Sequence, residues 1–316
     1  MKGCILDAGS LGPDIDLTAI LATLPEWSVW ESTRPEHVQE RLADVQIVLT
    51  NKVAVRRAHL QATPALKLIS VLATGTDHID LIAAAEQHVA VRNVRDYSTD
   101  SVVQHTLMLI LALAGNLSAN GSGENRAKWL SSPFFCHFNR PIVELKGKIL
   151  TIVGHGSQGQ KLAALARGLG MVVHIARRPG TSSNQESPGF ERRPLDELLP
   201  LTDVLSFHCP LTPTTVNLLN LDNIFKLKKG ALVVNCARGG IINEEALALA
   251  LAREHLGGAG VDVLTTEPPL ATHPLMNVSH PNFILTPHVA WGSLESRQRL
   301  IDETAKNVRA FLSGSS

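Results

Sequence analysis

Short runs rich in valine, isoleucine and leucine recur along the N-terminal third of the chain. They cover residues 3–8, 46–51, 66–75 and 89–94. The segments between them, such as residues 16–24 and 37–45, space their apolar positions as an amphipathic helix does. Strands that are apolar on both faces and alternate with helices predict a parallel sheet covered on both sides.

The same alternation restarts after a long helical pattern over residues 98–119 and a polar stretch over 120–135. We interpret the polar stretch as a surface crossing between two domains. Six further strand candidates follow, at residues 147–154, 171–176, 203–209, 230–236, 258–264 and 282–288. The last helical pattern, residues 293–314, is expected to return and pack on the first block.

Two such blocks predict an α/β protein with two Rossmann-like or flavodoxin-like domains. Each would be a doubly wound parallel sheet, with an active-site cleft between them. Residues 1–98 and 289–316 are predicted to form the substrate-binding (catalytic) domain, and residues 99–288 the dinucleotide-binding Rossmann domain.

Composition removes several classes of function. Lysine plus arginine number 29, as do aspartate plus glutamate, so the chain lacks the positive field of a nucleic-acid or membrane-surface binder. The N-terminal apolar run is too short for a signal peptide, so we expect a cytoplasmic protein. The four cysteines are far apart and no histidine pair has ligand spacing, which predicts reduced core thiols and no metal site.

A glycine-rich turn, G-x-G-x-x-G, lies at Gly154, Gly156 and Gly159 between an apolar strand and a helix. The first glycine permits a tight turn, the second lets the backbone approach a pyrophosphate, and the third allows close helix–strand packing. The N-terminus of the following helix would offer N–H groups to the phosphates. This context predicts a dinucleotide-binding site.

The strand after this turn ends in two arginines instead of an acid. A carboxylate there would bind the ribose 2′-hydroxyl of NAD(H), whereas Arg177 and Arg178 can hold a 2′-phosphate through charge-assisted hydrogen bonds. We therefore predict NADP(H) as the favoured cofactor, with NAD(H) as the alternative.

Three residues at consecutive predicted strand ends suit one reaction. Arg238 can bind the carboxylate of a 2-keto acid and polarise its carbonyl, and His288 can deliver a proton to the carbonyl oxygen. Glu267 would orient the histidine ring and favour its charged form. The order and spacing predict a hydride-transfer enzyme acting on a small 2-keto acid.

These motifs resemble those of the D-isomer-specific 2-hydroxyacid dehydrogenases over nearly the whole chain. The carriers are "VGHGSQG", "FHCPLTPTTVNLLN", "LKKGALVVNCARGGIINEEAL", "GVDVLTTEPP" and "NFILTPHVAWGS". The resemblance implies Arg238, Glu267 and His288 as the catalytic set. It implies substrate binding by Arg238 and His288 with Asn51, Lys52, Ala73, Thr74 and Gly75. It implies cofactor contacts from the glycine turn, Gly154, His155, Gly156, Ser157, Gln158 and Gly159, and from His208, Pro210, Thr215, Cys236, Ala237, Arg238, Asp262 and His288.

Within the family, "ATGTDHIDL" and "YSTDSVVQHTLMLILAL" look closest to hydroxypyruvate reductases, also called glycerate dehydrogenases. Such enzymes reduce hydroxypyruvate or glyoxylate and are usually homodimers, which implies a homodimer here, with Trp129 either at the interface or pocket or simply packed inside. Gln104 stands where the family more usually has a glutamate, and the sequence gives no physical reason for this difference. The alternatives are D-3-phosphoglycerate dehydrogenase, for which Lys52 and Lys67 would supply cations, another 2-keto-acid reductase, and a dinucleotide-sensing protein of corepressor type.

Overall fold

The computed structural model describes residues 1–177 and 192–314 and divides the chain into two compact units. The first unit comprises Met1–Ser98 and Trp291–Ser316, and the second comprises Thr99–Ala290. The chain therefore changes unit two residues later than the predicted return at residue 289. The predicted cleft between the two domains stays a prediction.

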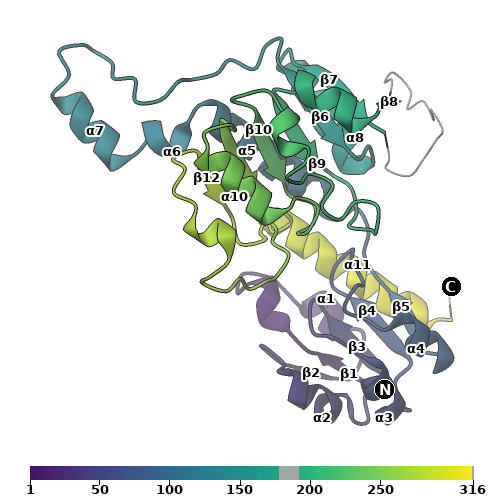
Figure 1. The fold of residues 1–316 in the computed structure, drawn as a ribbon. Helices are drawn as coiled ribbons and strands as arrows, with labels where there is room; N and C mark the ends of the chain where they lie inside the picture. The colour runs from purple at the N-terminus through teal and green to yellow at the C-terminus, as the bar shows by residue number, and fades with distance from the viewer. Residues whose placement is uncertain (178–191, 315–316) are drawn as a thin grey trace. The chain divides into compact units, whose positions relative to one another are not determined.

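Within the described residues, the first unit is built on a five-stranded parallel sheet in the order β2-β1-β3-β4-β5 (Figure 1). Its strands are β1 (Lys2–Ile5), β2 (Glu26–Val29), β3 (Ile47–Thr50), β4 (Leu68–Val71) and β5 (Ala90–Arg92). The four predicted strands are confirmed. Strand β2 was missed, because Glu26–Val29 is mostly exposed at the sheet edge and lacks an apolar run.

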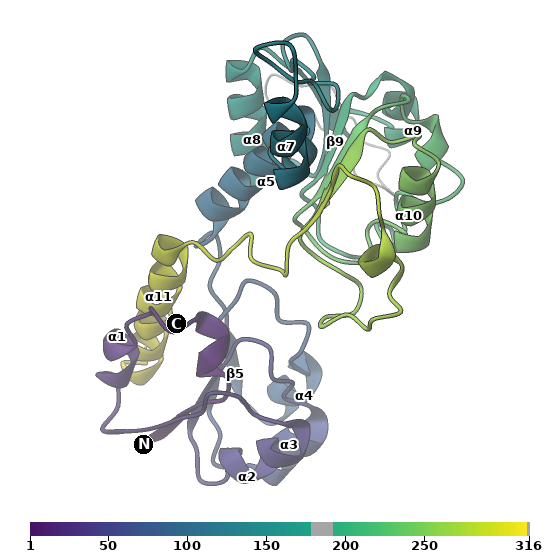
Figure 2. The same cartoon turned by 90° about the vertical axis from the view of Figure 1, so that its left-hand side faces the viewer.

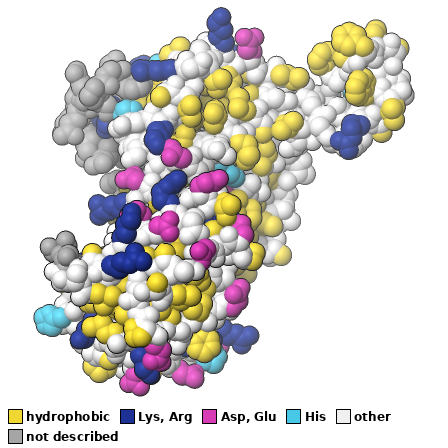
Figure 3. All heavy atoms as spheres, turned by 180° about the vertical axis from the view of Figure 1, so that it is seen from behind, with side chains coloured by type: hydrophobic (Ala, Val, Ile, Leu, Met, Phe, Trp, Pro, Cys, Tyr) yellow, Lys and Arg dark blue, Asp and Glu magenta, His cyan; other side chains and the backbone are white. Residues whose placement is uncertain are grey.

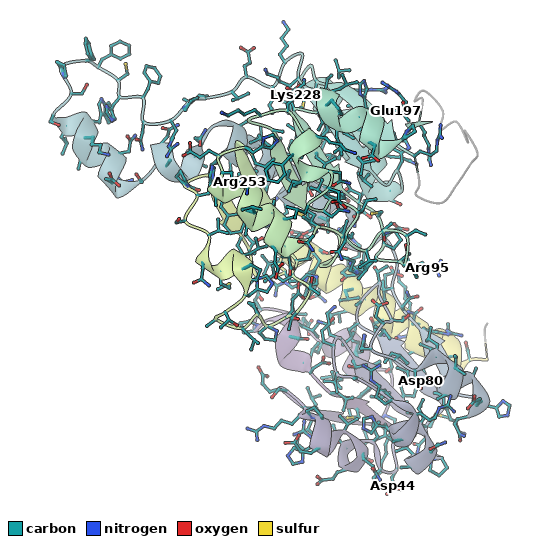
Figure 4. The ribbon with its side chains drawn as sticks, in the orientation of Figure 1. Asp44, Asp80, Arg95, Glu197, Lys228 and Arg253 are labelled. Carbon is teal, nitrogen blue, oxygen red and sulfur yellow. The ribbon has the colours of Figure 1, made fainter. Side chains whose placement is uncertain are left out.

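Helices cover both faces of this sheet. They are α1 (Thr18–Leu21), α2 (Val38–Leu42), α3 (Arg57–Ala62), α4 (Leu81–Glu86) and α11 (Leu294–Leu312). Asp80, labelled in Figure 4, caps α4 by accepting a hydrogen bond from the Ala83 backbone N–H at 2.9 Å. Helix α11 buries Leu300, Ile301 and Val308 in the core of this unit, so the predicted return of the last helix is confirmed.

Among the described residues of the second unit, seven parallel strands follow the order β12-β11-β10-β9-β6-β7-β8. They are β6 (Ile149–Val153), β7 (Val172–Ala176), β8 (Arg192–Arg193), β9 (Val204–Phe207), β10 (Leu232–Asn235), β11 (Gly258–Val261) and β12 (Phe283–Leu285). All six predicted strands are present. β8 was not predicted, because two arginines carry no strand signal.

The helices of the second unit are α5 (Thr99–Ala114), α6 (Leu117–Asn120), α7 (Gly123–Leu130), α8 (Ser157–Gly168), α9 (Leu195–Leu198) and α10 (Glu244–Ala252). The helical pattern over 98–119 breaks at Asn116, whose left-handed backbone (φ 47°) separates α5 from α6. The interpretation of 120–135 as a crossing between domains is wrong: these residues belong to the second unit and contain α7. Helix α7 stands away from that unit's sheet in Figure 1 and lies nearest the viewer, in front of α5, in Figure 2.

No helix in the described part of the chain is both long enough and apolar enough to cross a membrane. Cys4 and Cys236 are buried, whereas Cys136 and Cys209 are only half-buried, so the prediction of core thiols holds for the first two alone.

Candidate active site

The predicted catalytic and cofactor residues of the second unit gather at one edge of its sheet. The glycine turn follows β6, His208 follows β9, and Arg238 follows β10. Asp262 follows β11 and His288 follows β12. Because these strands are parallel neighbours, their carboxyl ends share one edge, which is where open α/β sheets bind ligands.

The glycine turn has the geometry that a dinucleotide requires. Gly154 has φ +101°, and a Cβ there would overlap the His208 carbonyl. A Cβ at Gly159 would overlap the Gly154 carbonyl, so this glycine allows α8 to approach the strand. At Gly156 a Cβ would meet nothing within 4 Å, which leaves the backbone before α8 open to a phosphate. These residues therefore fit the pyrophosphate of a nicotinamide dinucleotide.

Arginines lie near the end of β7, the predicted position of the ribose anchor. The Arg177 backbone N–H donates to the Arg193 carbonyl at 2.7 Å, and β8 pairs with β7 so that Arg192 lies beside Ile175. Burial lowers the pKa of His155, and the charges of Arg192 and Arg167 lower it further, so His155 is a neutral member of this region. Arg178 lies outside the described residues.

Glu267 and His288 form a short polar contact within the site. The His288 Nδ1 and Glu267 Oε2 atoms are 2.5 Å apart, and both side chains are about one-third exposed, at 27% and 34%. The other carboxylate oxygen of Glu267 accepts a hydrogen bond from the Leu264 backbone N–H at 2.8 Å. With Nδ1 bonded to the carboxylate, the opposite ring nitrogen, Nε2, is the candidate proton donor.

The backbone of His288 is left-handed, with φ +54°, which is costly for a residue with a Cβ. Asp262 holds it in place. The Asp262 carbonyl accepts from His288 N at 2.8 Å, and its carboxylate accepts from Val289 N at 2.9 Å and Ala290 N at 2.8 Å. The Thr286 hydroxyl donates to the same carboxylate at 2.5 Å and lies 3.1 Å from His105 Nε2. Asp262 is 1% exposed, so these bonds take the place of water around its charge.

The turn that carries Arg238 is braced by Asn235, the last residue of β10. The Asn235 amide accepts from Ala237 N at 3.0 Å and donates to the Arg238 carbonyl at 2.9 Å. A Cβ at Gly239 would overlap the Leu264 carbonyl, so the backbone beside Arg238 contacts the start of the Glu267 loop. The fold thus brings the arginine's turn against the segment that carries the carboxylate.

Glu244, at the start of α10, ties down the Glu267 loop on both sides. Its carboxylate accepts from Thr265 N at 2.7 Å and contacts His273 Nε2 at 2.9 Å. His273 Nδ1 accepts from Leu275 N at 3.2 Å, so the proton of the neutral ring lies on Nε2 and points at Glu244.

The other predicted substrate residues, Asn51, Lys52 and residues 73–75, belong to the first unit and follow β3 and β4. The Ala73 carbonyl accepts from Val94 N at 3.2 Å and the Thr74 carbonyl from Asn93 Nδ2 at 2.6 Å. In a trans peptide the N–H points opposite to the carbonyl, so the N–H groups of Thr74 and Gly75 point away from residues 93–94. Asn51 is 4% exposed and its amide donates to Ser10 Oγ at 3.0 Å, whereas the Lys52 side chain is exposed.

The remaining predicted cofactor contacts shape loops or are buried. Burial lowers the pKa of His208 to about 4 and raises that of the Cys236 thiol to about 12. The Thr215 hydroxyl donates to the Pro210 carbonyl at 2.7 Å and so closes the loop after β9. Gln104 is exposed on α5. Trp129 is 53% exposed, so the interpretation of it as buried packing is wrong.

Sequence reasoning missed Asn235, Glu244, Thr286 and His105. Each supports a catalytic loop by hydrogen bonds between residues distant in the chain, which leave no local pattern. Only Asn235 had a usable signal, because an amide side chain at the end of an apolar strand commonly bonds the backbone two residues further on.

Comparison with known proteins identifies the family. The D-isomer specific 2-hydroxyacid dehydrogenase, NAD binding domain, matches residues 107–290. The chain belongs to this family. It is 39% identical over 290 residues to a glycerate dehydrogenase of Methylorubrum extorquens, covering 92% of this chain and 90% of that protein. It is 36% identical over 319 residues to a hydroxypyruvate reductase of Blautia hydrogenotrophica, covering 100% of this chain and 98% of the relative.

Solved structures agree with this assignment. The D-lactate dehydrogenase of Aquifex aeolicus, solved with NAD and lactic acid, matches with a TM-score of 0.84 at 27% identity, over 100% of this chain and 96% of that one. The family resemblance seen in the sequence and the two-sheet α/β fold class are therefore confirmed. This member of the family is a 2-hydroxyacid dehydrogenase whose second unit binds a nicotinamide dinucleotide.

Proposed function

We propose that this 2-hydroxyacid dehydrogenase reduces hydroxypyruvate or glyoxylate to the D-2-hydroxy acid, with NADPH as the favoured reductant and NADH as the alternative. The observation that carries the proposal is the Glu267–His288 contact of 2.5 Å at the sheet edge that also bears the glycine turn. Relatives named glycerate dehydrogenase and hydroxypyruvate reductase support this choice of substrate.

The bound reduced nicotinamide supplies a hydride to the keto carbon, and the chain's own residues manage the charge that this creates. Arg238 binds the substrate carboxylate through its planar fork and polarises the adjacent carbonyl. His288 Nε2 gives a proton to the carbonyl oxygen as that oxygen becomes negative. Glu267 holds Nδ1, so the ring keeps the orientation and tautomer that this transfer needs.

The first unit supplies the remaining contacts in this proposal. The backbone N–H groups of Thr74 and Gly75, which point away from residues 93–94, would bind the substrate carboxylate together with Ala73. Lys52 would supply a positive charge beside the acid. Asn51 is buried and already donates to Ser10, so we propose it as support for Lys52 more than as a direct ligand.

The preference for NADPH rests on Arg177 and the cations near it. No carboxylate follows β7 at residues 176–178, and Arg192 on β8 adds a positive charge next to the end of that strand. Arg178 would help Arg177 to hold the 2′-phosphate, as the sequence predicts. In the same proposal, His208, Pro210, Thr215, Cys236, Ala237 and Asp262 line the remainder of the cofactor site.

A substrate with a 3-phosphate is the second candidate. A cavity of about 770 Å³ in the first unit is lined by Lys52 and Arg56 among others, which offers two cations to a phosphate. Lys67 does not support this candidate, because it directly precedes β4 and so lies at the amino end of the strand, opposite the site.

We also propose a homodimer, formed through the segment around α7. Large apolar side chains are exposed along it: Trp129, Leu130, Phe134, Phe135, Phe138 and Ile142. In Figure 3 this projecting segment carries a cluster of hydrophobic side chains. Phe135 is 92% exposed, and a patch of this kind on a water-soluble surface marks an interface. A second copy of the chain is the proposed occupant, and cytoplasmic localisation stays a prediction.

The test is steady-state kinetics of the purified chain with hydroxypyruvate, glyoxylate, pyruvate and 3-phosphohydroxypyruvate, each with NADPH and NADH. We expect the highest kcat/KM for hydroxypyruvate or glyoxylate with NADPH, and at least about 100-fold lower kcat in His288→Asn. Arg238→Lys should raise the KM for the keto acid, because a lysine cannot form the bidentate clamp. Absence of turnover with all four acids would refute the proposal, and preference for the phosphorylated acid would favour the second candidate.

A further inference from the structure

The turn after β3, residues Asn51–Val53, is held by a buried carboxylate from a neighbouring strand. Asp7 follows β1, which pairs with β3. Its Oδ1 atom accepts from Asn51 N at 2.9 Å, and its Oδ2 atom accepts from Lys52 N at 2.7 Å and Val53 N at 3.2 Å. Three consecutive backbone N–H groups therefore converge on one side chain.

The Asn51 side-chain amide is held separately, through Ser10 and the backbone of Asp7. The Ser10 hydroxyl donates to the Asp7 carbonyl at 2.7 Å and accepts from Asn51 Nδ2 at 3.0 Å. Both the backbone and the first side chain of the turn are thus fixed by residues 7–10.

Burying the Asp7 carboxylate costs free energy. It is only 6% exposed, and removing a carboxylate from water costs free energy that its hydrogen bonds must offset. Burial raises the pKa of Asp7, while the three backbone N–H groups and Lys52 lower it. An apolar side chain would leave these three backbone N–H groups without an acceptor, so the carboxylate both satisfies them and fixes the shape of the turn.

The turn lies where a ligand is expected to bind. β1 and β3 are adjacent, but the chain leaves β1 toward β2 on one side and returns to β3 on the other, so ligands are expected at their carboxyl ends. A cavity of about 770 Å³, large enough for a small acid, is lined there by Asp7, Ser10, Lys52 and Val53. The Lys52 side chain is exposed at this cavity.

We propose that Asp7 is a positioning residue for substrate: its carboxylate sets the shape of the Asn51–Val53 turn and thereby directs Lys52 toward the bound keto acid. This inference rests on the proposed function, because it takes Lys52 to be a substrate contact. Asparagine cannot replace Asp7 fully, since it has one acceptor oxygen and its NH₂ group would face a backbone N–H.

The experiment measures kcat and KM for hydroxypyruvate at saturating NADPH, together with the Kd for NADPH from its fluorescence. Asp7→Asn should raise the KM at least about tenfold and change kcat less than about threefold. The Kd for NADPH should stay within about twofold, because the glycine turn belongs to the other unit. A KM within about twofold of wild type in a folded Asp7→Asn would overturn the proposal.

A matched control and a double variant separate positioning from general destabilisation. Asp203 also bonds a backbone N–H with its carboxylate, that of Ile149 at 2.8 Å, but at the amino end of β6. Asp203→Asn should therefore leave the KM unchanged. In a Lys52→Met background, Asp7→Asn should add less than about twofold to the KM, and a full additional effect would show that Asp7 does not act through Lys52.

Two further outcomes also decide the proposal: an Asp7→Asn variant that does not fold, and a wild type that is inactive. If Asp7→Asn fails to fold, Asp7→Glu keeps the carboxylate but displaces it by one methylene group, and it should raise the KM for hydroxypyruvate about threefold; an unchanged KM would overturn the proposal. A wild-type chain without keto-acid reductase activity refutes the proposed function, whereas an active wild type with an unaffected Asp7→Asn refutes only the positioning role.

Discussion

The largely buried ring of His208 is expected to make the stability of the second unit depend on pH. His208 follows β9, its Nε2 lies 2.9 Å from Ser206 Oγ, and its Nδ1 is buried without a hydrogen-bond partner among the described residues. A second ring proton would therefore have no acceptor. Burial lowers the pKa of His208 from 6.5 to about 4, so the folded chain keeps the ring neutral where the unfolded chain protonates it.

The size of the effect follows from the two pKa values. A folded-state pKa below the unfolded value means that the unfolded chain binds more protons below pH 6.5, so stability present above that pH is lost as the pH falls toward 4. At pH 5 the unfolded ring is almost fully protonated and the folded ring is not. With about 1.4 kcal/mol per pKa unit, His208 costs about 2 kcal/mol at pH 5 relative to pH 7.5.

The assay is urea unfolding of the wild type and His208→Gln at pH 7.5 and pH 5 without cofactor. Glutamine does not titrate, so the stability advantage of the wild type over the variant should shrink by about 2 kcal/mol at pH 5. The pKa of His78 is also lowered to about 4, but both proteins contain it and its contribution cancels in the difference. His37→Gln, at an exposed position, is the control and should show no such change. An equal wild-type advantage at both pH values would refute the reasoning.

Four further predictions concern the cofactor, the acid and the interface. Glu267→Gln should lower kcat at least about tenfold in steady-state assays, because the His288 ring loses its charged partner; a normal kcat would contradict that role. Arg177→Asp should move the NADPH-to-NADH ratio of kcat/KM toward NADH by at least about tenfold, and an unchanged ratio would dismiss the phosphate contact. Gly159→Val should weaken NADPH binding measured by fluorescence, since its Cβ would displace the Gly154 carbonyl; an unchanged Kd would argue against the turn. Phe135→Glu should give a monomer by light scattering with an unchanged Tm, whereas a persistent dimer would exclude this segment as the interface.

Much of the fold could be predicted because buried strands leave a strong apolar signal. Every strand with such a run was predicted, and the two that were missed, β2 and β8, are an exposed edge strand and a pair of arginines. Periodicity also could not show that the long helical pattern breaks at Asn116, since that break depends on a left-handed backbone.

The candidate site divides in the same way. Gly154, Gly156 and Gly159 could be predicted with their individual roles, because each glycine answers a local backbone requirement. The supports of the site could not: Asp7 meets residues 51–53, and His105 meets Thr286, only through the assembled sheets. The predicted function of Asn51 illustrates the difference, because its burial follows from packing that its neighbours in sequence do not indicate.

The left-handed backbone at His288 restricts how its chemistry can be examined or altered. Glycine, asparagine, aspartate and histidine adopt φ near +54° more readily than other residues, so a valine or isoleucine at this site would rearrange the loop as well as delete the imidazole. Loss of activity in a variant with valine or isoleucine in place of His288 would therefore say little about proton transfer. The same restriction limits which residues could replace His288 during evolution, because most side chains would require the backbone to change and the bonds to Asp262 to be remade.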